Sequence, residues 1–149
     1  MFNFLWHKVV MDKKELLHNY LNHPMHTGLN LSVQQDNGTA RVSMVVNPNI
    51  CNLVGTLHGS FYFKLMDDAC FFAAISLNHH HFVATANFNI HYFLPVSKGK
   101  LSAIAKVINH DKNKYVCDCD IVDEDKHFCG HGSGLFVAPK KTYIYKPIN

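Results

Sequence analysis

The feature that most constrains this chain is a long apolar stretch with two acids in its middle. It runs from Gly55 to Ile75, beginning at a glycine-flanked turn, G-T-L-H-G-S, and it predicts a central helix over about residues 58–77. Asp67 and Asp68 lie about two turns or more inside that helix, where no unpaired backbone N–H group needs a cap. A helix this apolar must be covered on nearly all sides. The two acids must therefore be paired, reach solvent or take part in chemistry.

The segments on either side predict strands that cover this helix. Apolar residues at helical spacing predict a short first helix over residues 11–22, with Asp12 as N-cap and an end before Pro24. A turn signal, D-N-G, then predicts a hairpin. The expected strands of that hairpin are residues 29–34 and 40–46, and the four expected after the central helix are residues 82–94, 101–109, 115–123 and 127–137.

Short turns join these strands, and parallel neighbours would need long crossovers. We therefore expect consecutive strands to be antiparallel neighbours in an α+β fold, a curved sheet of about six strands wrapped around the central helix. The chain divides into an N-terminal helical segment (1–28), a sheet-and-helix domain (29–138) and a C-terminal tail (139–149) that packs or extends the last strand. Edge strands usually find a partner chain, which predicts a homo-oligomer.

Composition excludes several classes of function. The 149 residues suit one domain, and the net charge of +3 comes from scattered lysines with Arg41 as the only arginine. Nucleic-acid binders concentrate lysine and arginine on one face, so no nucleic-acid partner is expected. The sequence contains no stretch of about 18 apolar residues, the length needed to span a membrane, and its start lacks a basic leader. We expect a soluble, cytoplasmic protein with no membrane partner.

The cysteines and the histidine run are the candidate metal ligands. Five cysteines are present and none forms a C-x-x-C pair. On a strand, Cys117 and Cys119 share one face and Asp118 and Asp120 the other. Reduced structural thiols are the ordinary interpretation and metal binding by the pair is the alternative. We predict no metal and no cofactor, and an exposed loop for the histidines at 79–81.

Three segments together resemble one family. G-T-L-H-G-S followed by L-M-D-D-A, and later A-N-F-N-I-H-Y-F-L-P, resembles the hotdog-fold acyl-CoA thioesterases of the PaaI-like and thioesterase superfamily member 2 type. The likeness covers about residues 27–137. It implies a hotdog fold for residues 29–138, hydrolysis of acyl-CoA to free acid and CoA, and a homodimer or a tetramer built as a dimer of dimers.

The resemblance also implies roles for four residues in catalysis. Asp67 matches the general base or nucleophile, and Gly59 matches the glycine whose backbone N–H polarises the thioester carbonyl. Asn52 matches a residue that orients the carbonyl or the water, and Thr85 matches a hydroxyl that helps hold the attacking water. Asp67 and Gly59 would come from different subunits, which implies a site at a dimer interface.

Four further residues are implied in substrate binding. His58 fills the motif histidine, which is structural and orients the carbonyl, and Ser60 stands where the family has a second glycine. Lys112 and Lys114 are candidates to meet the phosphates of CoA, with a solvated turn as the alternative. The change at Ser60 leaves the expected oxyanion donor, Gly59, in place.

Elementary chemistry supports these assignments, and each keeps a structural alternative. Helix N-terminal N–H groups supply donors to an oxyanion, and desolvation makes a carboxylate on an apolar helix face a stronger base. Asp67 could instead be a buried structural acid hydrogen-bonded to a strand. Asn52 could only cap a helix or shape a turn, and Thr85 could have a purely structural role in its strand. Asp68 we expect to face solvent or an interface.

Two functions remain in competition. The leading one is acyl-CoA hydrolysis, and the alternative is a non-catalytic hotdog domain that binds acyl-CoA or a partner protein. A binding module has no need of an acid at position 67 with Asn52, Gly59 and Thr85 around it. A hotdog hydratase would pair histidine and acid in another motif, and a repressor would need a helix-turn-helix that the N-terminal segment is too short to supply.

Overall fold

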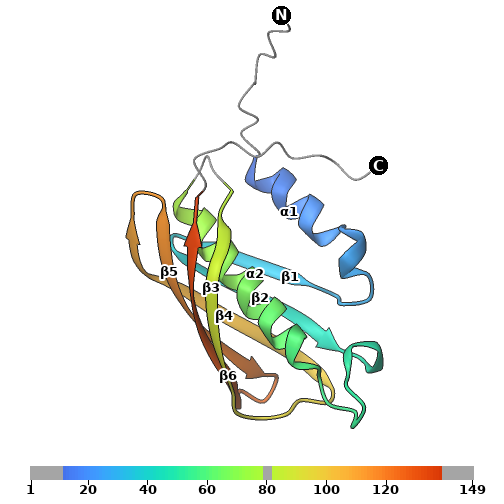
Figure 1. The fold of residues 1–149 in the computed structure, drawn as a ribbon. Coiled ribbons are helices and arrows are strands. Elements are labelled where there is room, and N and C mark those ends of the chain that lie inside the picture. Colours follow the sequence, from blue (N-terminus) through green and yellow to red (C-terminus); the bar gives the residue numbers. More distant parts are fainter. Residues whose placement is uncertain (1–11, 79–81, 139–149) are drawn as a thin grey trace, which may run out of the picture.

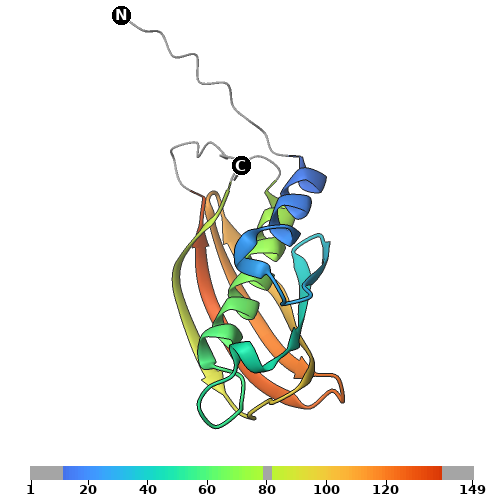
Figure 2. The same cartoon turned by 90° about the vertical axis from the view of Figure 1, so that its right-hand side faces the viewer.

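A computed structural model describes residues 12–78 and 82–138 of the chain. One six-stranded antiparallel sheet curves around the long helix α2 (Gly59–Leu77), and the shorter helix α1 (Lys13–Leu21) lies beside α2 (Figures 1 and 2). This confirms the predicted α+β class and the sheet wrapped around a central helix. The strands are β1 (Ser32–Asp36), β2 (Thr39–Val46), β3 (Ala84–Tyr92), β4 (Gly99–Asp111), β5 (Lys114–Asp123) and β6 (Phe128–Val137). The expectations for the C-terminal tail and the histidine run lie outside the described residues.

The strand order across the sheet is β1-β2-β4-β5-β6-β3, so that β1 and β3 form its edges. The predicted first hairpin is confirmed, with Asp36 opposite Thr39 and Gly38 at φ +81° in the turn. A positive φ is readily adopted only by glycine, which explains the D-N-G signal. The first strand begins at Ser32, three residues later than expected.

The prediction that β3 and β4 are neighbours is wrong. β3 pairs with β6 instead, with Tyr92 opposite Gly130, and β4 lies between β2 and β5. The six residues from 93 to 98 join the two strands. In extended form they reach about 20 Å, whereas three strand spacings amount to about 14 Å. A short connection can therefore pass under the end of the β5–β6 hairpin without joining neighbours.

The core lies between α2 and the concave face of the sheet. Met66, Ala69, Phe72 and Ala73 of α2 are fully buried, as are the inward-facing side chains of the central strands. Those strand residues include Val42, Met44, Leu101, Ala103, Ile121 and Phe136. The high apolar content of α2 therefore reflects burial around most of its circumference. No helix of the described residues is both long and apolar enough to cross a membrane.

The inward face of β5 carries two of the cysteines. Cys117 and Cys119 are buried, whereas Asp118 and Asp120 lie half-buried on the other face, as the alternation predicts. Hydrogen bonding to these two thiols, together with burial, raises the pKa of Cys70 on α2. All five cysteines are free. The buried thiol of Cys70 has the character of an inert core residue, because the reactive form of cysteine is the thiolate, which the raised pKa disfavours.

Candidate active site

Asp67 is held by a hydroxyl of the edge strand. Its carboxylate lies in the middle of α2 and accepts a hydrogen bond from Thr85, with 2.6 Å between Oδ1 and Oγ1. Burial raises the pKa of Asp67 above its ordinary value, and the Thr85 hydrogen bond partly opposes this effect. Desolvation makes the carboxylate a stronger base, and the hydroxyl keeps the ionised form accessible. The structure thus brings together two of the residues predicted to act on water.

A β-bulge directs Thr85 toward α2. Thr85 pairs with Phe136 and Asn87 pairs with Leu135, so Ala86 is an extra residue in β3. Side chains alternate along a regular strand. In a regular strand without the bulge, Thr85 stands three positions before Phe88, so it would lie on the opposite face and could not reach Asp67. Bulges that re-aim a side chain are common beside active sites.

The start of α2 offers a backbone donor. His58 precedes the helix and its Nδ1 accepts the Ser60 N–H at 3.1 Å, while the Ser60 hydroxyl lies 2.7 Å from the same nitrogen. Because Nδ1 accepts, the neutral ring carries its proton on Nε2. The Phe61 N–H bonds to the His58 carbonyl. Among the described residues no acceptor is bonded to the Gly59 N–H, so this donor points out of the first turn.

A pocket of about 550 Å³ opens beside this donor. Tyr92 of β3 covers one side and bonds to the Gly59 carbonyl at 3.3 Å. A Cβ at position 59 would lie 3.3 Å from the Tyr92 hydroxyl, so a side chain there requires the exposed Tyr92 ring to shift by a few tenths of an ångström. The lining comprises Thr56, Leu57, His58, Gly59, Tyr62, Tyr92, Phe93, Leu94 and Pro95.

Asn52 shapes the loop that leads into α2. Its Oδ1 accepts the N–H groups of Val54 and Thr56, each at 3.1 Å, and its Nδ2 donates to the Thr56 hydroxyl at 2.9 Å. These contacts match the alternative interpretation of Asn52, as a residue that only shapes its turn. Within the described chain, Asn52 is not brought to Asp67, and its role in orienting a carbonyl stays a prediction.

One chain does not unite the two halves of the site. Gly59 and Asp67 are eight residues apart on one helix, which corresponds to about 12 Å along its axis. A single thioester carbonyl could not contact both groups of the same chain. Lys112 lies in the β4–β5 turn and Lys114 begins β5. Figure 1 shows this turn near the C-terminal end of α2 and far from the start of that helix.

Asp68 does not face solvent, one of its two expected environments, because its carboxylate faces α1. Asp68 Oδ2 accepts hydrogen bonds from the Tyr20 hydroxyl at 2.5 Å and from Lys64 Nζ at 2.7 Å. The side chains of Lys64 and Asp68 are only 18% and 17% exposed. Burial, and then the charge of Asp68, raise the pKa of Tyr20, so the phenol stays a donor. Asp68 therefore anchors α1 on α2, while its neighbour Asp67 faces β3.

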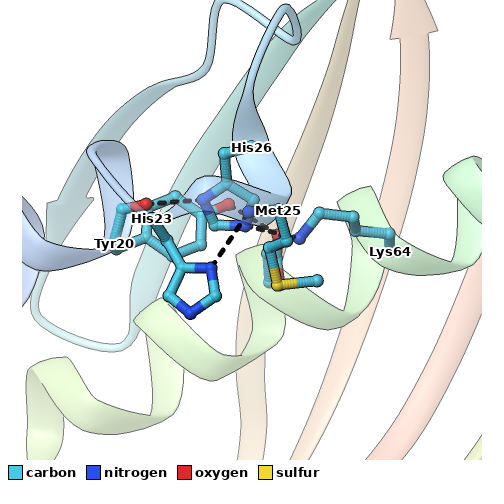
Figure 3. Close-up of polar contacts among 6 residues, drawn as sticks. Tyr20, His23, Met25, His26 and Lys64 are labelled. Carbon is cyan, nitrogen blue, oxygen red and sulfur yellow. Dashed lines mark hydrogen bonds and ion pairs between the residues drawn. The ribbon is translucent and has the colours of Figure 1, made fainter. Parts of the chain in front are cut away.

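His26 completes this network on the α1 side (Figure 3). Lys64 Nζ lies 2.9 Å from His26 Nε2, and His26 Nδ1 lies 2.5 Å from the Tyr20 carbonyl oxygen. A lysine ammonium has no acceptor, so Nε2 must accept and Nδ1 must carry the proton. Burial lowers the pKa of His26. A neutral imidazole of one defined tautomer thus joins the end of α1 to α2.

Tyr92 is a further residue of the candidate site, which the sequence analysis did not identify. Tyr92 falls on the same face of β3 as Phe88 and Ile90, and this alternation was the available signal. The pairing of β3 with β6, which places Tyr92 against the start of α2, has no local signal in the sequence.

Comparison with known proteins identifies the architecture as the hotdog fold. The PaaI protein from the phenylacetic acid degradation operon of E. coli superposes with a TM-score of 0.77 at 24% identity, over 87% of this chain and 94% of that one. A thioesterase of Haemophilus influenzae superposes with a TM-score of 0.76 at 20% identity, over 89% and 93%. A provisionally named esterase of Saccharolobus solfataricus is 25% identical over 107 residues, 72% of this chain and 71% of its own length.

The sequence model of the Thioesterase superfamily matches residues 54–129, which are 76 of the 149 residues. The chain therefore belongs to the thioesterase superfamily. The matched segment contains Gly59, Asp67 and Thr85, and family membership supports thioester hydrolysis as the type of reaction.

Proposed function

We propose that this protein hydrolyses acyl-CoA thioesters to the free acid and CoA, at sites that two chains of a homodimer share. The observation that carries the proposal is the Thr85–Asp67 hydrogen bond in the middle of a mostly apolar helix. An acid whose pKa is raised by burial and which is oriented by a hydroxyl is suited to activate water.

The geometry of β3 supports a shared site. Tyr92 at one end of this strand contacts Gly59, and Thr85 near the other end contacts Asp67. β3 is an edge strand with mostly exposed residues. Antiparallel pairing of two such edges about a twofold axis places the Tyr92 end of one chain beside the Thr85 end of the other. The Gly59 N–H would then approach the partner's Asp67. Two such dimers could form a tetramer.

The proposed reaction runs as follows. Water bound between Asp67 and Thr85 gives its proton to the Asp67 carboxylate while its oxygen attacks the thioester carbonyl carbon. The Gly59 N–H of the other chain, at the positive end of α2, stabilises the oxyanion. When the C–O double bond re-forms, the C–S bond breaks and the CoA thiolate leaves with the proton from Asp67. The carboxylate is thereby restored.

The remaining predicted residues have supporting parts in this proposal. The pocket beside Gly59 receives the part of the substrate next to the thioester sulfur, and His58 holds the helix start with Nε2–H free to donate. Lys112 and Lys114 meet CoA phosphates, and Asn52 keeps the loop before α2 in shape. All five thiols are free, in keeping with action in the cytoplasm.

A complementation experiment tests the shared site. Asp67→Asn removes the base, and Gly59→Pro removes the backbone donor at the first helical position, where proline is well tolerated. His58 has extended backbone angles, which suit a residue before proline. Each variant alone should lose about 100-fold or more of the activity on a panel of acyl-CoA esters.

Mixed dimers of the two variants contain one intact site and one site that lacks both groups. After subunit exchange, an equal mixture should recover about a quarter of the wild-type activity, because half the dimers are mixed and each has one of two sites. The control is each variant carried separately through the same exchange. Failure to recover any activity would refute the two-chain site. A wild type that hydrolyses no ester of the panel would favour the non-catalytic binding module.

A further inference from the structure

A stripe of three glycines runs along β6 beneath α2. Gly130, Gly132 and Gly134 alternate on the buried face of the strand, each without a side chain to fill the space above it. The space is occupied by other residues. A Cβ at Gly132 would lie 2.5 Å from Phe88 Cε1 and 2.8 Å from Met66 Sδ, and a Cβ at Gly134 would lie 2.4 Å from Phe88 Cδ2.

The glycine stripe is therefore a slot, and the Phe88 ring fills it. The ring enters from β3 and lies against the β6 backbone at two consecutive inward positions. It packs edge-on against Phe63 of α2, with 5.6 Å between ring centroids, and against Phe136, at 6.2 Å. No polar side chain takes part in these contacts.

The filled slot lies beside the proposed reaction centre. Met66 directly precedes Asp67, and Phe63 lies one helical turn before it. Phe136 is the register partner of Thr85, which bonds to Asp67. Phe63 is 39% exposed, so its ring connects the slot to the surface. An apolar group attached to a carbonyl held at Asp67 would therefore meet the Phe63 and Phe88 rings first.

Resting on the proposed function, we propose that Phe88 is a specificity-determining residue that closes the acyl end of the site. The wild-type site then takes short, uncharged, apolar acyl groups that end against the Phe63 and Phe88 rings. Truncation of Phe88 should open the slot over Gly132 and Gly134 to longer chains. The apolar surroundings exclude acyl groups that carry a charge, because a buried charge without a partner is unfavourable.

The experiment compares straight-chain acyl-CoA esters of increasing length on wild type and Phe88→Ala. For the wild type, kcat/KM should increase with acyl chain length only up to a short chain and then stop increasing. In Phe88→Ala the maximum should move to longer chains, with a gain of about fourfold for each further methylene buried until the slot is full. Since loss of a packed ring also lowers stability, Phe88→Leu provides a milder variant with a smaller shift in the same direction.

Two controls separate the slot from general loosening of the fold. Gly132→Ala in the Phe88→Ala background puts a methyl group back into the slot and should shorten the preferred chain again. Met44→Ala removes a fully buried side chain of β2, away from β3, and should lower stability without changing the chain-length profile. Folded Phe88→Ala and Phe88→Leu proteins with the wild-type profile would overturn the inference. Absence of all hydrolysis by the wild type would overturn the proposed function instead.

Discussion

The hydroxyl of Thr85 provides a direct test of the Asp67 site. In Thr85→Val the side chain keeps its shape but loses the O–H group that bonds to Asp67 at 2.6 Å. This hydrogen bond lowers the pKa of Asp67, against the larger raising effect of burial. Its loss should therefore move the pKa further upward, so that more of the base is protonated and inactive at mildly acidic pH.

The expected size of this pKa shift follows from the strength of a hydrogen bond to a charged group. Hydrogen bonds to charged groups contribute about 1.5–3 kcal/mol, and about 1.4 kcal/mol corresponds to one pH unit. Thr85 is exposed in the single chain, where water partly replaces a lost donor, so the lower end of the range applies. We expect the acid limb of the kcat/KM profile to move up by about one pH unit.

The assay follows CoA thiol release across this acid limb with a thiol reagent that works at low pH. Thr85→Ser keeps the hydroxyl and is the matched control, with an acid limb close to that of the wild type. The activity of Thr85→Val should approach its plateau as pH rises, apart from any loss in water positioning. Superimposed acid limbs for the wild type, the valine variant and the serine variant would refute the proposed link between Thr85 and the base.

Two further predictions concern the network around Asp68. Tyr20→Phe should lower the free energy of unfolding by about 1–2 kcal/mol in urea titrations, because it removes the hydroxyl bonded to Asp68 but keeps the ring against Phe72. An unchanged urea midpoint would contradict this prediction. His26 is held neutral with a lowered pKa, so its contribution to stability is complete above its ordinary value of 6.5 and decreases as pH falls from there toward the folded-state pKa. The urea midpoint of the wild type should therefore decrease as the pH is lowered from about 7.5 to about 5.5, and the decrease should be smaller in His26→Gln. Equal decreases in the two proteins would rule out His26 as the cause.

Sequence patterns predicted those parts of the fold that depend on local periodicity. The apolar run of α2, the D-N-G turn and the alternation of Cys117 and Cys119 each contain their own signal, and the structure agrees with all three. The partner of β3 does not have such a signal. Loop length limits which strands can be neighbours, but a six-residue connection is long enough to skip two strands.

The candidate site was predictable as a set of residues but not as an arrangement. Gly59, Asp67 and Thr85 were recognisable from their motifs, yet the position of Thr85 depends on a bulge that no residue pattern marks. From the sequence, the roles of Asp67 and Asp68 could be distinguished only by the family resemblance. In the structure they are separated by what faces them, Thr85 for one and Tyr20 with Lys64 for the other.

The bulge at Ala86 has a consequence for how this chain can vary. Ala86 is exposed and supplies no hydrogen-bonding side chain, so many residue types should be accepted there. Deletion of this residue would join Thr85 directly to Asn87, whose partners Phe136 and Leu135 are already consecutive, so the ladder would become regular and Thr85 would keep its face. Position 86 should thus be permissive to both substitution and deletion, because the bulge accommodates one residue without changing the face that any paired residue of β3 occupies.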